Sequence, residues 1–343
     1  MLEVIIFISS YLTIHPNLTT ILLYISKALG TTIKTFSNES LLYINQWIEE
    51  QLKNNDHIFF SVLNPDIESK YSGEIITIGE THYLYRGYKV WVNLAELHHC
   101  KMLTPQPIKE HTIQITFQKL NSHDSFHTAT IIKREEKYGT TSKFFQINKN
   151  EEPTFLHAYK KALEAVKIEQ RKSVLNLGIN KGDEFELIEQ LVGENRCFKD
   201  IELTGIDHSQ TALAYAKARF PMGNVHFFQK DLNQLSDLNL QKADLIISIG
   251  TLQSPSINYK PFLMSLVQEH LTENGALILG FPNSRWIDGE LIYGAKAPNY
   301  PYSEMSLLYN DVIFAKKYLQ QKKFRVTITG REYIFITATR INR

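Results

Sequence analysis

The second part of this 343-residue chain is predicted to fold as an α/β domain around a mostly parallel sheet. Two features predict it. From residue 153 onward, short apolar runs alternate with helical patterns almost without a break, which is typical of a parallel sheet covered on both faces. The chain then ends in two strand-like runs only a few residues apart. Since no helical crossover fits between them, the last strand must run antiparallel as a hairpin.

Seven runs rich in apolar and β-branched residues account for the strands of this sheet. In chain order they are SVLNLG, ELTGID, VHFFQKD, ADLIISIG, GALILGF, RVTITG and YIFITATR. A helical pattern after Pro153 places Phe155, Tyr159 and Leu163 on one face. Further helices are expected at about 183–192, 209–219, 232–240, 258–271 and 303–321.

The first 150 residues are expected to form a separate, smaller α+β domain. Helices are predicted at about 17–29 and 38–54, the second behind a cluster of capping residues. Antiparallel strands are expected in HIFFSVL, GEIITIG, HYLYRGYKVWV, HTIQITFQKL and FHTATII, which turn-forming residues separate. The polar stretch 137–153 has no clear period and is the expected linker. The predicted domains are therefore 1–150 and 151–343.

Composition argues against several partners. The chain has 37 Lys+Arg and 36 Asp+Glu, and a net charge of +1 gives no electrostatic reason to bind nucleic acid or an anionic membrane. The apolar N-terminal run is interrupted by Pro16 and Asn17 and is shorter than the ~18 uncharged residues of a membrane span. Two cysteines outside any CxxC pair suit a reducing cytoplasm. The sequence HHC at 98–100 lacks the spacing of a zinc site, so no metal is expected.

The loop in VLNLGINKG, residues 174–182, is the expected ligand site. In an open parallel sheet, ligands bind beyond the carboxyl ends of the strands. Gly178 and Gly182 would let the backbone approach a ligand closely, and Asn180 is a residue that tolerates left-handed backbone geometry.

A nicotinamide dehydrogenase is the nearest enzyme alternative, and the loop argues against it. A GxGxxG pattern that starts at Gly178 needs glycines where the chain has Asn180 and Asp183. Asp183 and Glu184 would also open the following helix, whereas a pyrophosphate prefers a helix N-terminus without acids. Acids in that first turn suit a cationic ligand.

Residues from about 153 to 341 resemble a class I S-adenosylmethionine-dependent methyltransferase domain. VLNLGINKG is similar to the first-strand loop of that family, and LTGIDHSQTALAYAK (203–217) to its second strand and helix. HFFQKDL (226–232), ADLIISIGTLQ (243–253) and HLTENGALILGFPN (270–283) are similar to the third, fourth and fifth strands. The resemblance implies a Rossmann-like seven-stranded sheet, S-adenosyl-L-methionine as cofactor, and methyl transfer. The first 150 residues resemble no family.

The resemblance also implies which residues hold the cofactor. Asp207 would accept the ribose hydroxyls beside His208, and Asp231 would accept the adenine amino group beside Leu232. Simpler roles compete with these: a helix N-cap for Asp207, which Ser209 could fill instead, and a turn cap for Asp231. Asn176, Ile249, Gly250 and Thr251 are expected at the methionine end, and Gly178, Asn180 and Gly182 are expected to bring the loop backbone close to the cofactor.

Asn176 departs from the family, which has an acid there that holds the methionine ammonium. Asparagine keeps an acceptor and loses the charge, and hydrogen bonds to ions are roughly twice as strong as neutral ones. Weaker cofactor affinity is therefore expected. A second hypothesis, a binding or scaffold protein without turnover, is motivated by Asn176 and Asn180.

The methyl acceptor is open, and no catalytic side chain is identified. After the fourth strand, SIGTLQSPS lacks the motifs of amino-directed and cytosine-directed methyltransferases. The aromatic segment 281–302 is the expected substrate lid. A small molecule is favoured as acceptor because charge is balanced and the lid is aromatic; RNA and protein remain alternatives, and the oligomeric state is open. The candidate substrate residues are Asn283, Arg285, Trp286, Tyr293 and Tyr300.

Overall fold

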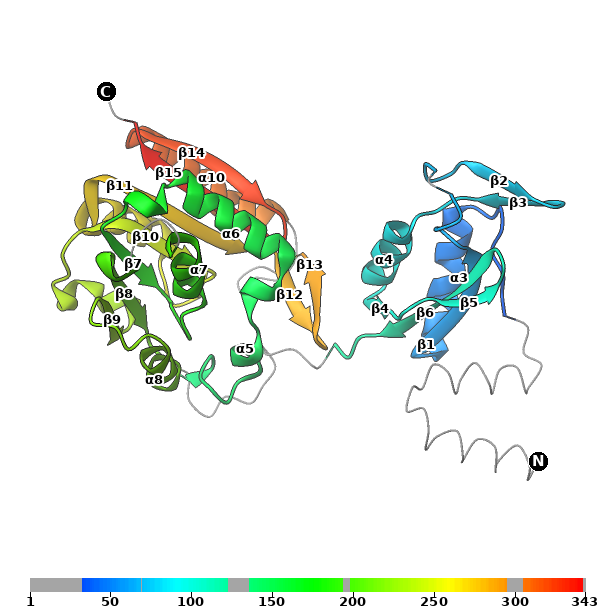
Figure 1. Cartoon of the computed structure of the whole chain (residues 1–343), viewed down its shortest axis with the longest axis horizontal. Helices are drawn as coiled ribbons and strands as arrows, with labels where there is room; N and C mark the ends of the chain where they lie inside the picture. The colour runs from blue at the N-terminus through cyan, green and yellow to red at the C-terminus, as the bar shows by residue number, and fades with distance from the viewer. Residues whose placement is uncertain (1–32, 69, 123–135, 194–197, 295–304, 342–343) are drawn as a thin grey trace. The chain divides into compact units, whose positions relative to one another are not determined.

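The computed structural model describes residues 33–68, 70–122, 136–193, 198–294 and 305–341 (Figure 1). The chain divides into two compact units, Met1–Leu120 and Asn121–Arg343. The helix expected at 17–29 and the strand expected in FHTATII lie outside the described residues. Within those residues, no helix is long and apolar enough to cross a membrane.

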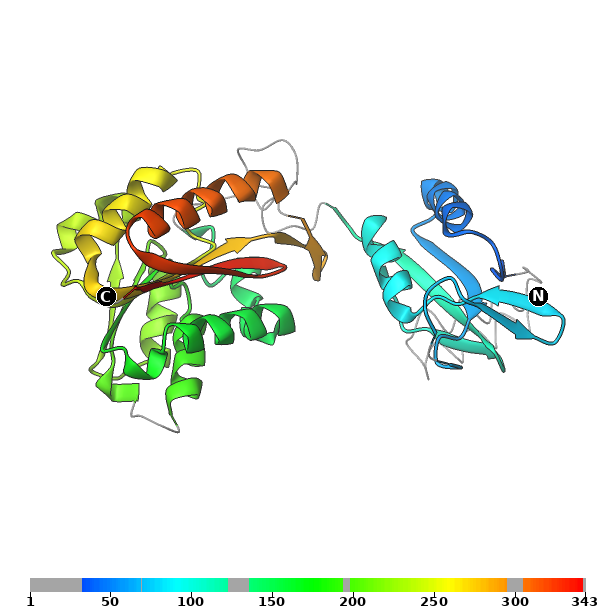
Figure 2. The same ribbon diagram turned by 90° about the horizontal axis from the view of Figure 1, so that it is seen from above.

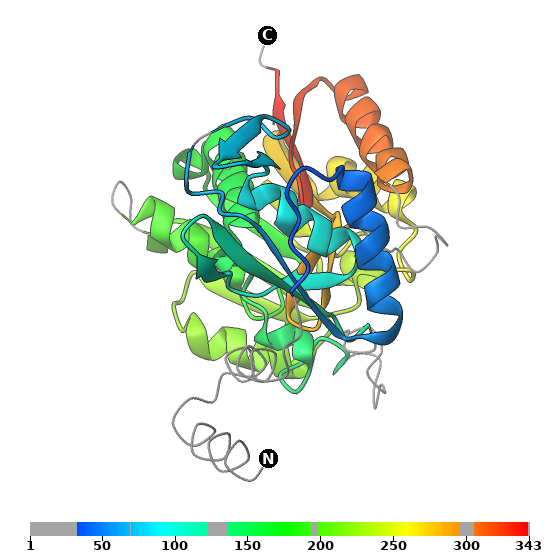
Figure 3. The ribbon, with the colours of Figure 1, turned by 90° about the vertical axis from the view of Figure 1, so that its right-hand side faces the viewer.

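The first unit packs two helices against a small antiparallel sheet. Its sheet has the order β1-β6-β4, with β5 paired to β6, and a separate hairpin joins β2 to β3. The helix α3, drawn in blue in Figure 3, buries Ile44 and Ile48 in a core that also contains Phe60, Trp91 and Phe117. The elements are α3 (Leu41–Asn54), β1 (His57–Leu63), β2 (Ile75–Ile78), β3 (Thr81–Leu84), α4 (Tyr88–Leu97), β4 (Cys100–Met102), β5 (Gln106–Lys109) and β6 (Thr112–Lys119).

One predicted strand of this unit is wrong in its second half. HYLYRGYKVWV was expected to be a single strand, but β3 ends at Leu84 and α4 begins at Tyr88. Gly87 is the N-cap of that helix, and Trp91, Leu94 and Ala95 are buried at helical spacing. Aromatic and β-branched residues favour strands only weakly, so burial of the helical face overrides them here.

The second unit contains the predicted seven-stranded sheet, with the order β14-β15-β11-β10-β7-β8-β9. Neighbours among β7 to β11 pair in parallel, and β15 pairs antiparallel with both β11 and β14. This confirms the mostly parallel sheet and its C-terminal antiparallel hairpin. The strands are β7 (Ser173–Leu177), β8 (Glu202–Asp207), β9 (Val225–Gln229), β10 (Ala243–Ile249), β11 (Leu271–Pro282), β14 (Phe324–Gly330) and β15 (Tyr333–Arg340).

Helices cover both faces of this sheet (Figure 2). Apolar residues of α6, α7 and α8 form one core with Val174 of β7, and residues of α9 and α10 form another with Leu175 and Leu177. Side chains alternate along a strand, so Asn176 lies on the face of α6 and α7. The expected helix at 232–240 is a 3₁₀ segment, Leu232–Leu238. The helices are α6 (Pro153–Ala165), α7 (Asp183–Val192), α8 (Gln210–Arg219), α9 (Tyr259–Ser265) with a π-helical turn Leu266–His270, and α10 (Met305–Gln321).

The boundary between the units falls after Leu120, earlier than the expected residue 150. Residues 136–152, which the sequence pattern assigned mostly to a linker, contain the short helix α5 (Lys143–Gln146) and pack on the second unit. Glu136 accepts hydrogen bonds from Ser209 Oγ at 3.0 Å and Gln210 N at 2.9 Å. Polar contacts of this kind leave no hydrophobic period in the sequence, so the pattern could not reveal them.

The expected lid contains a hairpin where no regular structure was predicted. Its strands are β12 (Ser284–Ile287) and β13 (Glu290–Tyr293). The two-residue turn, Asp288 and Gly289, has φ angles of 50° and 80°, which is the type I′ geometry of tight hairpins. Asp-Gly between apolar residues was the sequence signal for it.

Candidate active site

The loop after β7 has the backbone geometry that a cofactor loop requires. Gly178, Asn180 and Gly182 have φ angles of 80°, 47° and 90°. The left-handed conformation expected for Asn180 is therefore confirmed. Its side-chain Nδ2 donates to Tyr138 O at 2.8 Å, which ties the loop to residues 136–152.

Gly178 faces the loop that follows β10. A Cβ at Gly178 would run into the Thr251 side chain, and Gly250, with a φ of 74°, lies beside Pro282 and the Tyr333 ring. Ile249, at the end of β10, is 3% exposed. The carboxyl ends of β7 and β10 thus meet closely, with room for backbone only at glycine positions.

Asp207 ends β8 and holds the adjoining loops together. Its Oδ2 accepts from Asn180 N and its Oδ1 accepts from Ser209 N, both at 2.9 Å. Ser209 caps α8, so capping that helix is not the role of Asp207. His208 Nδ1 lies 3.7 Å from Asp207 Oδ1, and the His208 ring stands edge-on to the Tyr138 ring.

Asp231 has the capping role that competes with adenine binding. It is exposed at the start of the 3₁₀ segment, and its Oδ1 accepts from Asn233 N at 2.9 Å and from Asn233 Nδ2 at 3.0 Å. The adjacent Leu232 is buried. Adenine recognition by these two residues stays a prediction.

Asn176 is the least satisfied side chain in this region. It is 1% exposed, and neither its Oδ1 nor its Nδ2 has a hydrogen-bond partner among the described residues. Buried polar groups in native proteins are nearly always bonded. An orphaned amide at this strand end fits a site whose partner is a ligand.

The two acids that open α7 have different surroundings. Asp183 lies 2.9 Å from Arg219 Nη1 and 3.6 Å from Lys181 Nζ, so protein cations balance its charge. Glu184 is 3% exposed and has Lys149 Nζ at 3.7 Å. Of the two acids expected to suit a cationic ligand, only Glu184 therefore remains without a short ion pair in the described protein.

Burial governs the electrostatics of Glu184. Desolvation raises its pKa to about 7; Lys149 opposes this rise, and the carboxylates of Asp183 and Asp207 add to it. Lys149 lies 5.9 Å from the centre of the Tyr333 ring. The sequence pattern missed Lys149 because its segment was interpreted as a linker.

These contacts link loops and strand ends at the carboxyl edge of the sheet, and we call the residues that make them the edge cluster. Gly178 packs against Thr251, and Asp207 accepts from Asn180 N. Lys149 lies near both the Tyr333 ring and Glu184. The edge cluster comprises Gly178, Asn180, Asp207, Thr251, Tyr333, Lys149 and Glu184.

The candidate substrate residues only partly come together. Asn283 is buried, and its Nδ2 donates to Arg331 O at 3.0 Å. Arg285 Nη1 donates to Gly294 O at 3.3 Å, and the Arg331 guanidinium lies 5.7 Å from the centre of the Tyr293 ring. Trp286 is half-buried and pairs with Leu291 across the hairpin. Tyr300 lies outside the described residues.

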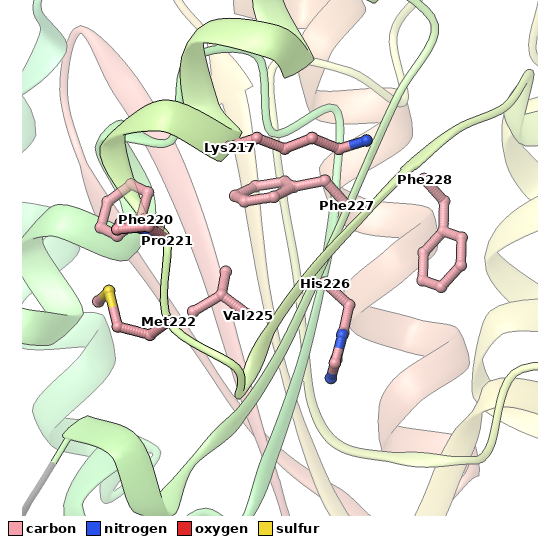
Figure 4. Close-up of a pocket in the computed structure, with 8 residues that line it drawn as sticks. All are labelled: Lys217, Phe220, Pro221, Met222, Val225, His226, Phe227 and Phe228. Carbon is pink, nitrogen blue, oxygen red and sulfur yellow. The ribbon is translucent and has the colours of Figure 1, made fainter.

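A hollow of about 350 Å³ lies along the edge strand β9, apart from the residues described above (Figure 4). It contains none of the predicted site residues. Its lining comes from the end of α8, the turn that follows and β9: Lys217, Phe220, Pro221, Met222, Val225, His226, Phe227 and Phe228.

The HHC segment has no metal-site geometry in the described part of the chain. No group of three or more His, Cys, Asp or Glu side chains that could hold a metal ion occurs among the described residues. Burial raises the pKa of the Cys100 thiol to about 11, which disfavours the thiolate that a metal needs.

Comparison with known proteins finds a family model that is similar to part of the second unit. Residues 168–325 match the family model described as a methyltransferase domain. Similar solved structures include a SAM-dependent methyltransferase from Aquifex aeolicus, at 18% identity and a TM-score of 0.40, which covers 57% of this chain and 98% of that one. Another is the plantazolicin methyltransferase BpumL in complex with SAH, at 13% identity and a TM-score of 0.44, with 60% and 94% covered. No curated protein sequence matches this chain.

Proposed function

We propose that this chain, whose C-terminal unit is a class I S-adenosylmethionine-dependent methyltransferase domain, transfers a methyl group from S-adenosylmethionine to a small-molecule acceptor. The observation that carries the proposal is the edge cluster. There Gly178 packs closely against Thr251, Asn180 N donates to the buried Asp207 carboxylate, and the buried Asn176 amide has no partner among the described residues.

The residues present fit the cofactor. Asp207 would accept ribose hydroxyls with the lone pairs that Asn180 N and Ser209 N leave, because a carboxylate has about four acceptor sites. Gly178 and Gly250 give the backbone its close approach. When bound, S-adenosylmethionine supplies an electrophilic methyl group on a sulfonium, and the protein contributes alignment and exclusion of water.

The charge balance of the chain favours a small acceptor over RNA. Burial raises the pKa of Glu152, and the carboxylates of Glu332 and Glu290 raise it further. Arg331 pairs with Glu332 at 3.1 Å, so charges of both signs occur in this region. With a net charge of +1, the chain has no excess of the basic groups that RNA binding needs.

The alternative is a binding protein that keeps the fold without turnover, and Asn176 motivates it. Calorimetry with S-adenosylmethionine and S-adenosylhomocysteine first tests whether the cofactor binds, which the enzyme hypothesis requires. We expect both to bind the folded protein; absence of binding at millimolar ligand would remove the enzyme hypothesis.

The acceptor class is tested with methyl-labelled S-adenosylmethionine and separate pools of small metabolites, RNA and protein. We expect label in the small-molecule pool. Label in RNA, together with association that weakens steeply with salt, would replace the proposal by an RNA methyltransferase. Label in protein would replace it by a protein methyltransferase, and binding without label in any pool would favour the non-catalytic alternative.

The ribose role of Asp207 is tested by Asp207→Asn, which keeps the side-chain shape and removes the charge. If Asp207 accepts ribose hydroxyls, 2′-deoxy-S-adenosylhomocysteine should bind wild type about tenfold more weakly than the natural ligand, since hydrogen bonds to charged groups contribute about 1.5–3 kcal/mol. The variant should hardly distinguish the two ligands. A purely loop-ordering Asp207 would instead leave the ratio of the two affinities unchanged by the substitution.

A further inference from the structure

We propose that Glu184 and Lys149 form a charged pair that receives the amino-acid end of the cofactor, with Glu184 supplying the negative charge that Asn176 lacks. The inference rests on the proposed function, because it requires S-adenosylmethionine or its product to bind at the carboxyl edge of the sheet. It assigns the methionine group to two residues outside the glycine loop.

The first observation is the orientation of Asn176. Leu175 and Leu177 contribute to the core beside α9 and α10, so Asn176 lies on the opposite face, with α6 and α7. Its amide has both an acceptor and donors, and no described residue uses either. A neutral group of this kind serves a ligand that carries both a donor and an acceptor.

The second observation is Glu184 on the same face, at the start of α7. Its backbone carbonyl accepts from Tyr159 Oη of α6 at 3.4 Å, and the Tyr159 ring belongs to the core that contains Val174. Asn176 and Val174 share a strand face. The acid therefore opens a helix that packs on the same face of the sheet as Asn176.

The third observation is the separation within the pair. Lys149 Nζ and Glu184 Oε1 are 3.7 Å apart, whereas a charge-assisted hydrogen bond is about 2.7–2.9 Å long. Their side chains are only 16% and 4% exposed. Two charges that are this deeply buried gain most from further hydrogen bonds, and each side chain still has donor or acceptor sites to form them.

A zwitterion of matching polarity satisfies all three groups. The ammonium of the methionine moiety would donate to Glu184, and its carboxylate would accept from Lys149. Asn176 could accept from the first group or donate to the second. Opposite charges that face each other in a buried site attract strongly.

A purely structural pair is the competing interpretation, and two neighbours argue against it. Asn150 Nδ2 already fastens the segment to α7 by donating to Asp183 O at 2.9 Å and to Glu186 Oε2 at 3.1 Å. The pair between Asp183 and Arg219, at 2.9 Å, shows the closer contact that a structural ion pair makes on the same helix. The segment therefore has anchors to α7 besides Lys149.

The test compares two ligands by calorimetry at pH 8 in the full-length protein. S-adenosylhomocysteine has the amino-acid end, and 5′-methylthioadenosine has the adenosine and sulfur without it. Glu184→Gln should weaken S-adenosylhomocysteine binding by about tenfold or more, as expected for a lost charge-assisted hydrogen bond, and leave 5′-methylthioadenosine binding unchanged. Glu189→Gln removes an exposed acid from the same helix and should change neither affinity.

A second variant, Lys149→Met, keeps the inference testable if Glu184→Gln disturbs folding, because it removes the other half of the pair and should likewise weaken S-adenosylhomocysteine binding without changing 5′-methylthioadenosine binding. A third variant tests the charge itself. Asn176→Asp combined with Glu184→Gln moves the acid to the strand end and should restore S-adenosylhomocysteine affinity to within a few fold of wild type. Equal weakening of both ligands by Glu184→Gln, or no weakening of either, would overturn the inference. Wild type that binds neither ligand would instead overturn the proposed function, so the two failures are distinct.

Discussion

The two faces of the seven-stranded sheet differ in what they bury beside β7. On the face of α9 and α10, Leu175 and Leu177 meet apolar side chains, and the polar Ser248 donates to Leu177 O at 3.2 Å. On the face of α6 and α7, the same strand presents Asn176, whose amide is unbonded within the described residues. Beside β7, the first face is apolar and bonded within the protein, and the second keeps a buried amide without a partner among the described residues.

The difference shows how one strand serves both stability and binding. Side chains alternate along a strand, so adjacent residues enter different environments. Apolar burial on one face fixes the strand end in space. On the other face, groups such as Asn176 and Glu184 can then be held at a cost in stability that the rest of the fold tolerates.

The largest expected effect is on the apolar face. Leu277→Ala removes a fully buried side chain from β11, and such changes cost about 2–5 kcal/mol. Urea denaturation should show a lower midpoint with an unchanged slope, and S-adenosylhomocysteine affinity of the folded variant should equal that of wild type. A change in affinity would show that the two faces are not independent.

A smaller, pH-dependent effect is expected from Lys149→Met. Burial raises the pKa of Glu184 to about 7 from its ordinary 4.5, so the folded protein binds that proton more tightly than the unfolded chain does. The contribution of Glu184 to folding stability therefore falls as pH rises from about 4.5 through 7. Lys149 offsets part of this loss of stability, whereas the carboxylates of Asp183 and Asp207 increase the loss.

Without Lys149, the variant should be less stable than wild type by on the order of 1–3 kcal/mol at pH 8.5. The difference should vanish near pH 5, where Glu184 is protonated in both proteins. Thermal melts of the ligand-free proteins at the two pH values measure it. A loss of equal size at both would mean that Lys149 stabilises through packing alone.

The smallest effect is expected from Asn176→Leu, and it has the opposite sign. Replacing an unbonded buried amide by an apolar group of similar size should stabilise the ligand-free protein by about 1 kcal/mol. The same change should weaken S-adenosylhomocysteine binding. Denaturation of wild type and variant, with and without S-adenosylhomocysteine, measures both the change in stability and the change in binding. A destabilised ligand-free variant would indicate that Asn176 has a structural partner.

Much of the second unit could be predicted from the sequence because its signals are local. The run SVLNLG gave β7, the pattern after Gly182 gave α7 over Asp183–Val192, and the short spacing before YIFITATR required an antiparallel last strand. The left-handed Asn180 followed from residue type alone. The hairpin at Asp288 and Gly289 was equally local, and its Asp-Gly turn signal was overlooked.

What the sequence could not give depends on contacts between distant residues. The helix over Tyr88–Leu97 forms against strand propensity because Trp91 and Leu94 reach the core of the first unit. Residues 136–152 pack on α7 and α8 through polar contacts that leave no periodic pattern. The different surroundings of Asp183 and Glu184 depend on Arg219 and Lys149, which are remote in the chain.

The sequence by itself therefore determined the succession of strands and helices in the second unit, the glycine-containing loop after β7 and the methyltransferase resemblance, because periodicity, glycine positions and turn spacing are read from neighbouring residues. Tertiary structure alone decided which acid is balanced by the protein and which polar side chain is left without a partner. The reason is physical: burial and charge pairing are properties of the space around a residue, and that space is filled from elsewhere in the chain.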